Sequence, residues 1–192
     1  MKGKNNMELF EKQISSRQIF DGRVVKLYVD DIELPNGKES IREVVRHPGA
    51  VCVIPITDEK EVIMVRQFRY PFGRTLLEIP AGKLEPNEDP LEAVKRELEE
   101  ESGVVAQRLD FMGMIYTTVA FTDEKIYAYM ARGLSYTESH PDEDEFLELE
   151  RVPLDKLVDM VMAGEIRDSK TQVAILKAEK ILSLEEKDRN EH

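Results

Sequence analysis

Three glutamates on one predicted helix are the residues of this chain best suited to chemistry. Residues 89–102 predict a helix, and at 100° per residue Glu101, Glu97 and Glu100 follow one another along one flank beside an apolar stripe. Like charges at this spacing repel each other by about a few tenths of a kcal/mol per pair. Clustered carboxylates suit Mg²⁺, Mn²⁺ or Ca²⁺, and the lack of His or Cys beside them disfavours zinc. The pattern therefore predicts a divalent-cation site.

The sequence also marks where this helix begins and ends. Asp89 is a suitable N-cap, Pro90 suits the first helical position, and Gly103 suits a left-handed stop. Glu92, three residues after Asp89, predicts a capping box. The helix that carries the glutamates is therefore predicted with both of its ends.

The remaining faces of the helix predict how it packs. Leu91, Val94 and Leu98 form the apolar stripe that we expect to be buried. Arg96 lies four residues before Glu100, so we expect its guanidinium to orient a carboxylate. A Glu-rich helical face is more often simply solvated, and this alternative is the commoner one for the segment taken alone.

The spacing around the helix changes that balance. Gly82 is followed by Glu88 and Arg96, and residues 97–104 read Glu-Leu-Glu-Glu-Glu-Ser-Gly-Val. This arrangement resembles the Nudix box, Gly-x5-Glu-x7-Arg-Glu-hydrophobic-x-Glu-Glu-x-Gly-hydrophobic. Seven of its positions require one residue type, so chance agreement is about one in 10⁸ per starting position. The resemblance implies a loop–helix–loop that holds Mg²⁺, with Mn²⁺ as a substitute.

The resemblance extends to segments outside the box and covers most of residues 18–184. These segments are similar to the ADP-ribose pyrophosphatase branch of the Nudix hydrolases, and they are Leu27–Asp31, Arg46–Val51, Arg66–Arg69, Leu77–Leu84 and Asp142–Phe146. The implied reaction is hydrolysis of the pyrophosphate bond of a nucleoside diphosphate sugar, with ADP-ribose giving AMP and ribose 5-phosphate. Several Mg²⁺ ions would activate the attacking water.

The resemblance also implies the metal ligands and the general base. Glu97 and Glu101 would be the principal ligands, Glu100 would add to them, and Ala81 would offer its backbone carbonyl. Glu145 resembles the remote acid that binds a further metal ion or activates water, and Glu143 is the near-equal candidate for the base. Both lie in the acidic run 141–145, for which a solvated loop is the alternative interpretation.

Substrate-binding residues follow from the same resemblance. Arg69 and Arg46 resemble the arginines that clasp the diphosphate, which suits a planar guanidinium that stays charged. A surface salt bridge is the alternative for both. Lys83 and Glu124 are the further substrate-binding candidates. Where the branch often has Pro-Gly, this chain has Val119-Ala120, in a loop that contributes to substrate selection in the family.

The elements expected along the chain combine hairpins with helices. This predicts an α+β fold in which helices cover a mixed sheet, and the resemblance implies an α/β/α sandwich. We expect an N-terminal β-hairpin appendage over 1–46, which is not an independent domain, a Nudix hydrolase domain over 47–184, and a frayed tail over 185–192. A strand pair is expected from Phe20 to Arg46 around a turn at 35–37, and the last helix is expected over about 169–184.

Composition excludes several classes of function. The chain has 192 residues and a formal net charge of −12, which argues against coating nucleic acid or binding an anionic membrane. It has no apolar run long enough to cross a membrane and no signal-peptide pattern at its start. Cys52, the single cysteine, allows no internal disulfide and is expected in the core. We expect a cytoplasmic protein, and the resemblance implies a homodimer in which the N-terminal strands reach the other subunit and Arg46 serves the partner's site.

Three alternatives remain open. The substrate could be another nucleoside diphosphate derivative, such as GDP-mannose or a dinucleotide. The chain could instead be a non-catalytic sensor that binds a nucleotide sugar, although every carboxylate of the box is present. A calcium-binding helix–loop module is disfavoured because the D-x-D-x-D-G loop is absent.

Overall fold

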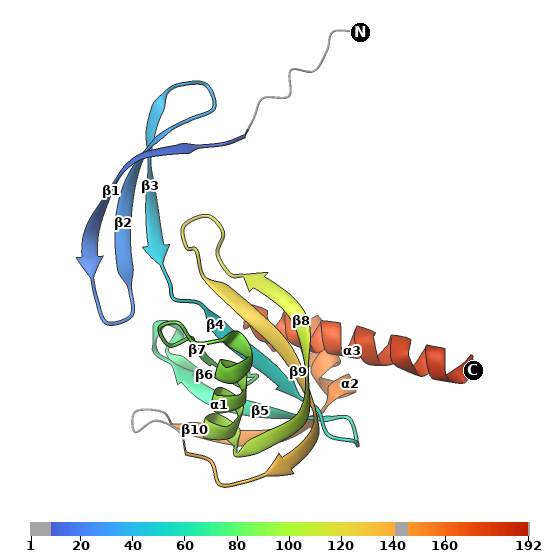
Figure 1. The fold of residues 1–192 in the computed structure, drawn as a ribbon. Helices are drawn as coiled ribbons and strands as arrows, with labels where there is room; N and C mark the ends of the chain where they lie inside the picture. Colours follow the sequence, from blue (N-terminus) through green and yellow to red (C-terminus); the bar gives the residue numbers. More distant parts are fainter. Residues whose placement is uncertain (1–8, 141–145, 192) are drawn as a thin grey trace, which may run out of the picture. The chain divides into compact units, whose positions relative to one another are not determined.

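The computed structural model describes residues 9–140 and 146–191, which fold into two compact units (Figure 1). Of the described residues, the first unit contains those up to His47 together with Thr118–Glu124, and the second contains Pro48–Thr117 together with those from Lys125 onward. Three antiparallel strands form the sheet of the first unit, in the order β1 (Lys12–Asp21), β2 (Lys26–Glu33) and β3 (Glu39–Arg46). Dimerisation through this segment stays a prediction.

The first unit has one strand more than the predicted hairpin. The sequence pattern placed one long strand from Phe20 to Leu34, whereas the structure turns at Gly22 and pairs β1 with β2. Every residue of β1 is exposed, so its sequence lacks the alternation that marks a strand with one buried face. The predicted turn at 35–37 is confirmed, because Gly37 has a φ of +77° between β2 and β3.

Two sheets form the framework of the second unit. The three-stranded sheet is antiparallel and has the order β10 (Leu147–Pro153), β5 (Glu61–Arg69) and β6 (Arg74–Glu78). The four-stranded sheet has the order β7 (Ala81–Lys83), β4 (Ala50–Pro55), β9 (Lys125–Tyr136) and β8 (Val104–Tyr116), and it is mixed because β4 and β9 run parallel. The strand β4 is buried along its whole length, as its unbroken apolar run predicts.

Three α-helices cover these sheets on two sides (Figure 1). They are α1 (Pro90–Ser102), α2 (Leu154–Met162) and α3 (Ser169–Asn190), and a short 3₁₀ turn, η1 (Tyr70–Phe72), follows β5. One buried cluster joins the sheet residues to α2 and α3, and another joins Val51 and Val53 of β4 to α1. Because β4 contributes to both clusters, helices pack on its two faces. The predicted α+β class, with an α/β/α sandwich and a mixed sheet, is confirmed.

The ends of α1 follow the sequence in most details. Asp89 accepts a hydrogen bond from the backbone of Leu91 at 2.8 Å, and Gly103 ends the helix with a φ of +62°. The predicted capping box is wrong, because the Glu92 carboxylate pairs with Lys95 at 2.7 Å on the exposed face. Leu91 is 38% exposed, since it lies in the first turn, whereas Val94 and Leu98 are buried as predicted.

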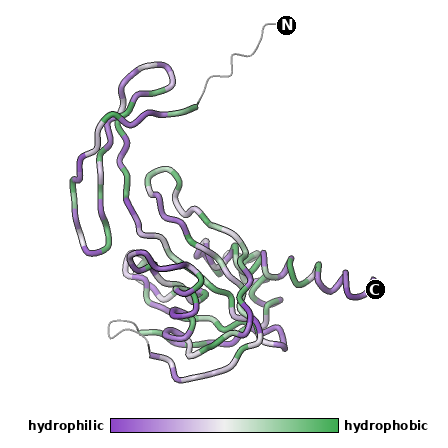
Figure 2. The backbone as a smooth tube through the Cα atoms, in the orientation of Figure 1, coloured by the Kyte–Doolittle hydropathy of each residue, from purple (hydrophilic) through white to green (hydrophobic). Residues whose placement is uncertain are grey.

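The helix α3 extends beyond its predicted end and includes most of the segment expected to fray. It continues to Asn190 because its last turns carry carboxylates that pair with Arg132 of β9 and with Lys60, which lies in the turn before β5. Glu185 binds Arg132 at 2.7 Å, and Glu186 pairs with Lys60. Figure 2 shows that this end of α3 is hydrophilic, so ion pairs rather than apolar burial hold it. None of the helices in the described ranges is both long and apolar enough to span a membrane.

Candidate active site

The loop that enters the candidate site is joined directly to the end of α1. The backbone N–H of Ala81 donates to the Glu101 carboxylate at 3.0 Å. Glu101 is only 5% exposed, which is rare for a carboxylate without a charged or hydrogen-bonded partner. The strand β7, which begins at Ala81, therefore starts beside one of the two predicted principal ligands.

Glu97 lies against the next residue of the same loop. A Cβ atom built on Gly82 would stand 1.9 Å from Cδ of Glu97 and 2.0–2.1 Å from its two oxygens. Such a contact is impossible, so only glycine allows this carboxylate to reach the backbone. Glu97 and Glu101 thus converge on Ala81–Gly82, which explains the glycine at the start of the box.

Arg96 organises the carboxylates as the sequence predicts. Its Nε and Nη2 bind both oxygens of Glu88 at 2.9 and 3.1 Å, while Nη1 binds Glu97 at 2.8 Å and Glu100 at 2.9 Å. The hydrogen bond with Glu88 is the main cause that raises the pKa of Arg96 above its ordinary range. The guanidinium therefore keeps its charge and fixes two of the three helical glutamates.

Burial of the three glutamates follows the order along the helix flank that the sequence predicts. Glu101 is buried, Glu97 has a side chain that is 13% exposed, and Glu100 has one that is 43% exposed. Glu100 therefore borders solvent, whereas Glu101 faces the protein interior. Within residues 9–140 and 146–191, no group of three or more His, Cys, Asp or Glu side chains is arranged to hold one metal ion.

The donors at Ala81–Gly82 nevertheless fit a hard divalent cation. Two carboxylates reach the same two-residue segment, and the carbonyl oxygens of its backbone are further possible ligands. Glycine at position 82 leaves the space that Glu97 needs beside them. Glu143 and Glu145, the predicted base candidates, lie outside the described residues.

Arg69, the predicted diphosphate-binding residue, is held in place by a buried carboxylate. Its Nε and Nη2 each donate to an oxygen of Glu78 at 2.8 Å, and Glu78 is only 2% exposed. The hydrogen bond to Glu78 is the main cause that raises the pKa of Arg69, and the charge of Glu101 contributes too. The Arg69 side chain is still 36% exposed, so it is not enclosed by the protein.

The other substrate-binding candidates divide between the two units. Arg46 lies in the first unit, where it pairs with Asp30 at 3.1 Å and with Asp123 at 3.2 Å. Glu124 belongs to the same unit and lies 3.6 Å from the Nε2 of His47. Lys83 is an exposed residue at the end of β7 in the second unit. The contacts of Arg46 in the structure are therefore salt bridges, and its role in substrate binding stays a prediction.

Sequence reasoning missed three residues around this site. Glu88 was recognised only as a position of the box, yet it holds Arg96 by two hydrogen bonds. Glu78 and Lys170 form a buried ion pair that no local spacing indicates. The available signal was the charge of Glu78 between Leu77 and Ile79, since a carboxylate inside an apolar strand needs a partner.

Cys52 has no part in this chemistry. It is fully buried in β4, and burial raises the pKa of its thiol to about 12. The thiol therefore stays protonated at neutral pH and is not a nucleophile. Its predicted place in the core is confirmed.

Comparison with known proteins identifies the class to which this fold and site belong. The NUDIX domain matches residues 46–173, and the nucleoside diphosphate sugar hydrolase N-terminal domain matches residues 11–45. The chain belongs to the Nudix family, and its enzyme class is that of a Nudix hydrolase. Nudix hydrolases generally use divalent metal ions.

Two relatives and one solved structure are similar to almost the whole chain. ADP-ribose pyrophosphatase of Bacillus subtilis (strain 168) is 50% identical over 169 residues, which cover 87% of this chain and 91% of the relative. Methanol dehydrogenase activator of Bacillus methanolicus is 50% identical over 167 residues, covering 86% and 90%. A crystal structure of an ADP compounds hydrolase has a TM-score of 0.82 at 24% identity, covering 91% of this chain and 95% of that one, which supports the fold.

Proposed function

We propose that this chain hydrolyses the pyrophosphate bond of ADP-ribose, giving AMP and ribose 5-phosphate. The observation that carries the proposal is the convergence of Glu97 and Glu101 on Ala81–Gly82. The 50% identity to a protein named ADP-ribose pyrophosphatase supports the choice of substrate. Atoms balance because one water adds across the P–O–P bridge, leaving a phosphate monoester on each product.

We propose Mg²⁺ as the cation, with Mn²⁺ as a substitute. Glu97, Glu101 and the carbonyl of Ala81 would hold it, and Glu100 would add a further oxygen. When bound, the cation would offset the charge of the diphosphate and make water a stronger nucleophile. The donor set supports this choice because it consists of oxygen atoms, which hard cations prefer.

The protein's own residues would bind the anion and move the proton. The guanidinium of the partly exposed Arg69 side chain would donate to diphosphate oxygens, while Glu78 keeps the side chain in place. Arg46, Lys83 and Glu124 are proposed as further substrate-binding residues. Glu145 or Glu143 would accept the proton from the attacking water.

A substrate panel tests the proposal directly. ADP-ribose, GDP-mannose and a dinucleotide would be compared by kcat/KM, with the products separated by chromatography. We expect ADP-ribose to be preferred and to yield AMP. Preference for GDP-mannose or the dinucleotide would instead support one of the alternative substrates, and the change to Val119-Ala120 makes this comparison informative. Binding without any hydrolysis would support the sensor alternative.

A second candidate function comes from the other 50% identical relative, which is named a methanol dehydrogenase activator. We propose as the alternative that this chain activates a dehydrogenase. Added to methanol dehydrogenase, the wild-type protein would then raise the rate of alcohol oxidation. A Glu101→Gln variant tells whether any activation depends on the hydrolytic site.

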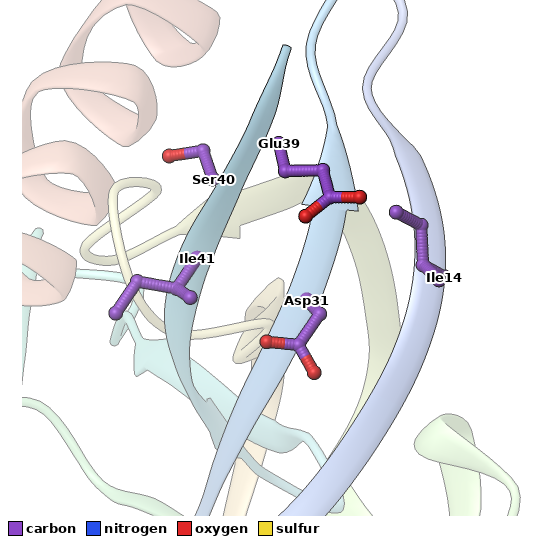
Figure 3. Close-up of a pocket in the computed structure, with 5 residues that line it drawn as sticks. All are labelled: Ile14, Asp31, Glu39, Ser40 and Ile41. Atoms are coloured by element: carbon purple, nitrogen blue, oxygen red, sulfur yellow. The ribbon is translucent and has the colours of Figure 1, made fainter.

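We also propose a homodimer formed through the N-terminal strands. Large apolar side chains on these strands are more than half exposed, and they are Ile14, Ile19, Phe20 and Ile41. Ile14 and Ile41 line an open hollow of about 430 Å³ together with Asp31, Glu39 and Ser40 (Figure 3). A small sheet with exposed apolar residues gains stability when it packs on another surface. A second copy of the chain would supply that surface.

A cytoplasmic location is the last part of the proposal. Cys52 is a free, buried thiol, which is compatible with a reducing compartment. Fractionation of cells that express the protein, followed by detection in the soluble cytoplasmic fraction, tests it.

A further inference from the structure

A buried lysine, Lys170, shares a carboxylate with Arg69, the arginine that we propose binds the diphosphate. Lys170, at the start of α3, is 8% exposed and pairs with the same Glu78 that holds Arg69. Glu78 thus accepts hydrogen bonds from Arg69 and Lys170 at once. A single carboxylate therefore links the sheet arginine to the helix lysine.

Lys170 is itself held by the first turn of α3. Its Nζ lies 3.0 Å from Oδ2 of Asp168, and Asp168 caps the helix by accepting the N–H of Thr171 at 2.9 Å. The same start of the helix reaches the loop before the box, because the backbone N–H of Ile79 donates to the Thr171 hydroxyl at 3.1 Å. The first turn of α3 consequently fixes both the side chain of Glu78 and the backbone that follows it.

The charges of this cluster balance only when Lys170 is present. Arg69 and Lys170 carry two positive charges, and Glu78 and Asp168 carry two negative ones. Burial alone would raise the pKa of Glu78, but the hydrogen bond from Arg69 and the charge of Lys170 outweigh it and hold this pKa below its ordinary value. Without Lys170, Arg69 would face two carboxylates and the cluster would carry a net negative charge.

We propose that Lys170 is a positioning residue for substrate binding: it neutralises Glu78 so that Arg69 retains its orientation and its attraction for the substrate's diphosphate. The inference rests on the proposed function, in which Arg69 binds that diphosphate. Lys170 is buried behind Glu78 and acts through it, whereas the partly exposed Arg69 side chain contacts the anion. The effect of Lys170 on substrate is therefore electrostatic and indirect.

A charge-balance experiment separates this role from a merely structural one. Lys170→Met, Lys170→Arg and the double variant Lys170→Met/Glu78→Gln would be compared with wild type, using ADP-ribose and Mg²⁺. Lys177→Met is the matched control, since Lys177 lies in the same helix and binds the backbone of Met112 in β8. Thermal unfolding of each variant verifies that it is folded at the assay temperature.

We expect Lys170→Met to raise KM about tenfold while kcat changes by less than about threefold, because the lost charge weakens anion binding. Lys170→Arg keeps the positive charge, so its KM should stay closer to wild type than that of Lys170→Met. The double variant should have a KM closer to wild type than Lys170→Met, since it removes one charge of each sign. Lys177→Met should leave both constants unchanged.

Two results overturn the inference. Either an unchanged KM in folded Lys170→Met, or a double variant with a KM as high as that of the single variant, shows that Lys170 does not act through the charge of Glu78. If Lys170→Met is unfolded, Glu78→Gln and the double variant decide instead. Once the charge of Glu78 is gone, loss of Lys170 should add no further rise in KM, so a clearly higher KM in the double variant than in Glu78→Gln overturns the inference. Absence of hydrolysis in the wild-type protein would instead refute the proposed function.

Discussion

The backbone N–H of Ala81 donates to the Glu101 carboxylate at 3.0 Å, across a separation of 20 residues. This bond joins the strand that opens the box to the last turn of α1, so it holds the loop against the helix. Because Glu101 is 5% exposed, its position is fixed by the protein interior.

Glu101→Gln should lower turnover at least about a hundredfold, as expected for loss of a major electrostatic contributor. The amide retains an oxygen that can accept the N–H of Ala81, so the fold should be preserved. Steady-state kinetics and circular dichroism measure the two effects. Glu99→Gln, on the exposed face of the same helix, is the control and should have normal turnover. Near-normal turnover in Glu101→Gln would refute the ligand assignment.

Gly82→Ala should displace Glu97, since the added methyl group would lie within 1.9–2.1 Å of its carboxylate. Displacement by about 1 Å is expected to lower kcat about a hundredfold. The backbone of Gly82 is outside the left-handed region, so the loss would come from the contact rather than from strain. A double-mutant cycle with Glu97→Ala verifies this, because the alanine at 82 should add little once Glu97 is gone.

Removal of divalent cations with EDTA should abolish hydrolysis, because the site gathers carboxylates that would repel a diphosphate without a cation. Millimolar Mg²⁺ should restore the rate, and Mn²⁺ should restore it in part. Activity that persists in EDTA after exhaustive dialysis would contradict the proposed cation. Zn²⁺ is the comparison ion, and the oxygen donors predict that it supports little activity.

Acid should weaken the attachment of α3 to the sheet. The hydrogen bond from Arg132 is the main cause that lowers the pKa of Glu185 below its ordinary value. Burial alone would raise the pKa of Asp110, but hydrogen bonds from Arg132 and Arg108 outweigh it and hold this pKa below its ordinary value. Because the unfolded chain then binds more protons, this stability is complete above about pH 5 and is lost as the pH falls through the folded values.

Urea unfolding at pH 7 and at pH 3.5 measures this dependence. Arg132→Met should reduce the free energy of unfolding by roughly 1–2 kcal/mol at pH 7 and by less at pH 3.5. Lys180→Met removes a positive charge from an exposed position of the same helix and serves as the control. An equal loss in Arg132→Met at both pH values would show that packing, not charge, explains its effect.

Deletion of residues 1–46 should convert a dimer into a monomer and lower activity, if the exposed apolar strands form the subunit contact. Gel filtration with light scattering measures the mass, and the same preparation is assayed with ADP-ribose. Thermal unfolding verifies that the remaining unit is folded. An unchanged dimer with full activity would refute the role assigned to these strands and to Arg46.

Local spacing predicted the parts of the site that depend on one helix. The N-cap Asp89, the stop at Gly103 and the order in which Glu101, Glu97 and Glu100 are buried all follow from helical periodicity. Arg96 was placed correctly for the same reason, because its partners on the helix lie one and four residues away. Family resemblance then supplied the chemistry that spacing alone does not define.

Contacts between distant parts of the chain were the ones that sequence reasoning missed. Lys170 and Glu78 are 92 residues apart, and neither has a local pattern that points to the other. The end of α3 was placed too early because its stabilising partners, Arg132 of β9 and Lys60 of the turn before β5, are distant in sequence. The strand β1 was missed because it has no buried face. Each of these features depends on a contact between residues that are far apart in the sequence, and a short stretch of sequence does not show which residues will meet.

The deep burial of Cys52 has a practical consequence for studying motion in this enzyme. Its thiol is fully buried and has a pKa of about 12, so maleimide and nitroxide reagents should leave it unmodified at neutral pH. A cysteine introduced at an exposed position would then be the sole labelled residue in an otherwise wild-type chain. A fluorescent or spin probe placed on each unit in turn would report how the mobility around the labelled residue changes when a nucleotide binds.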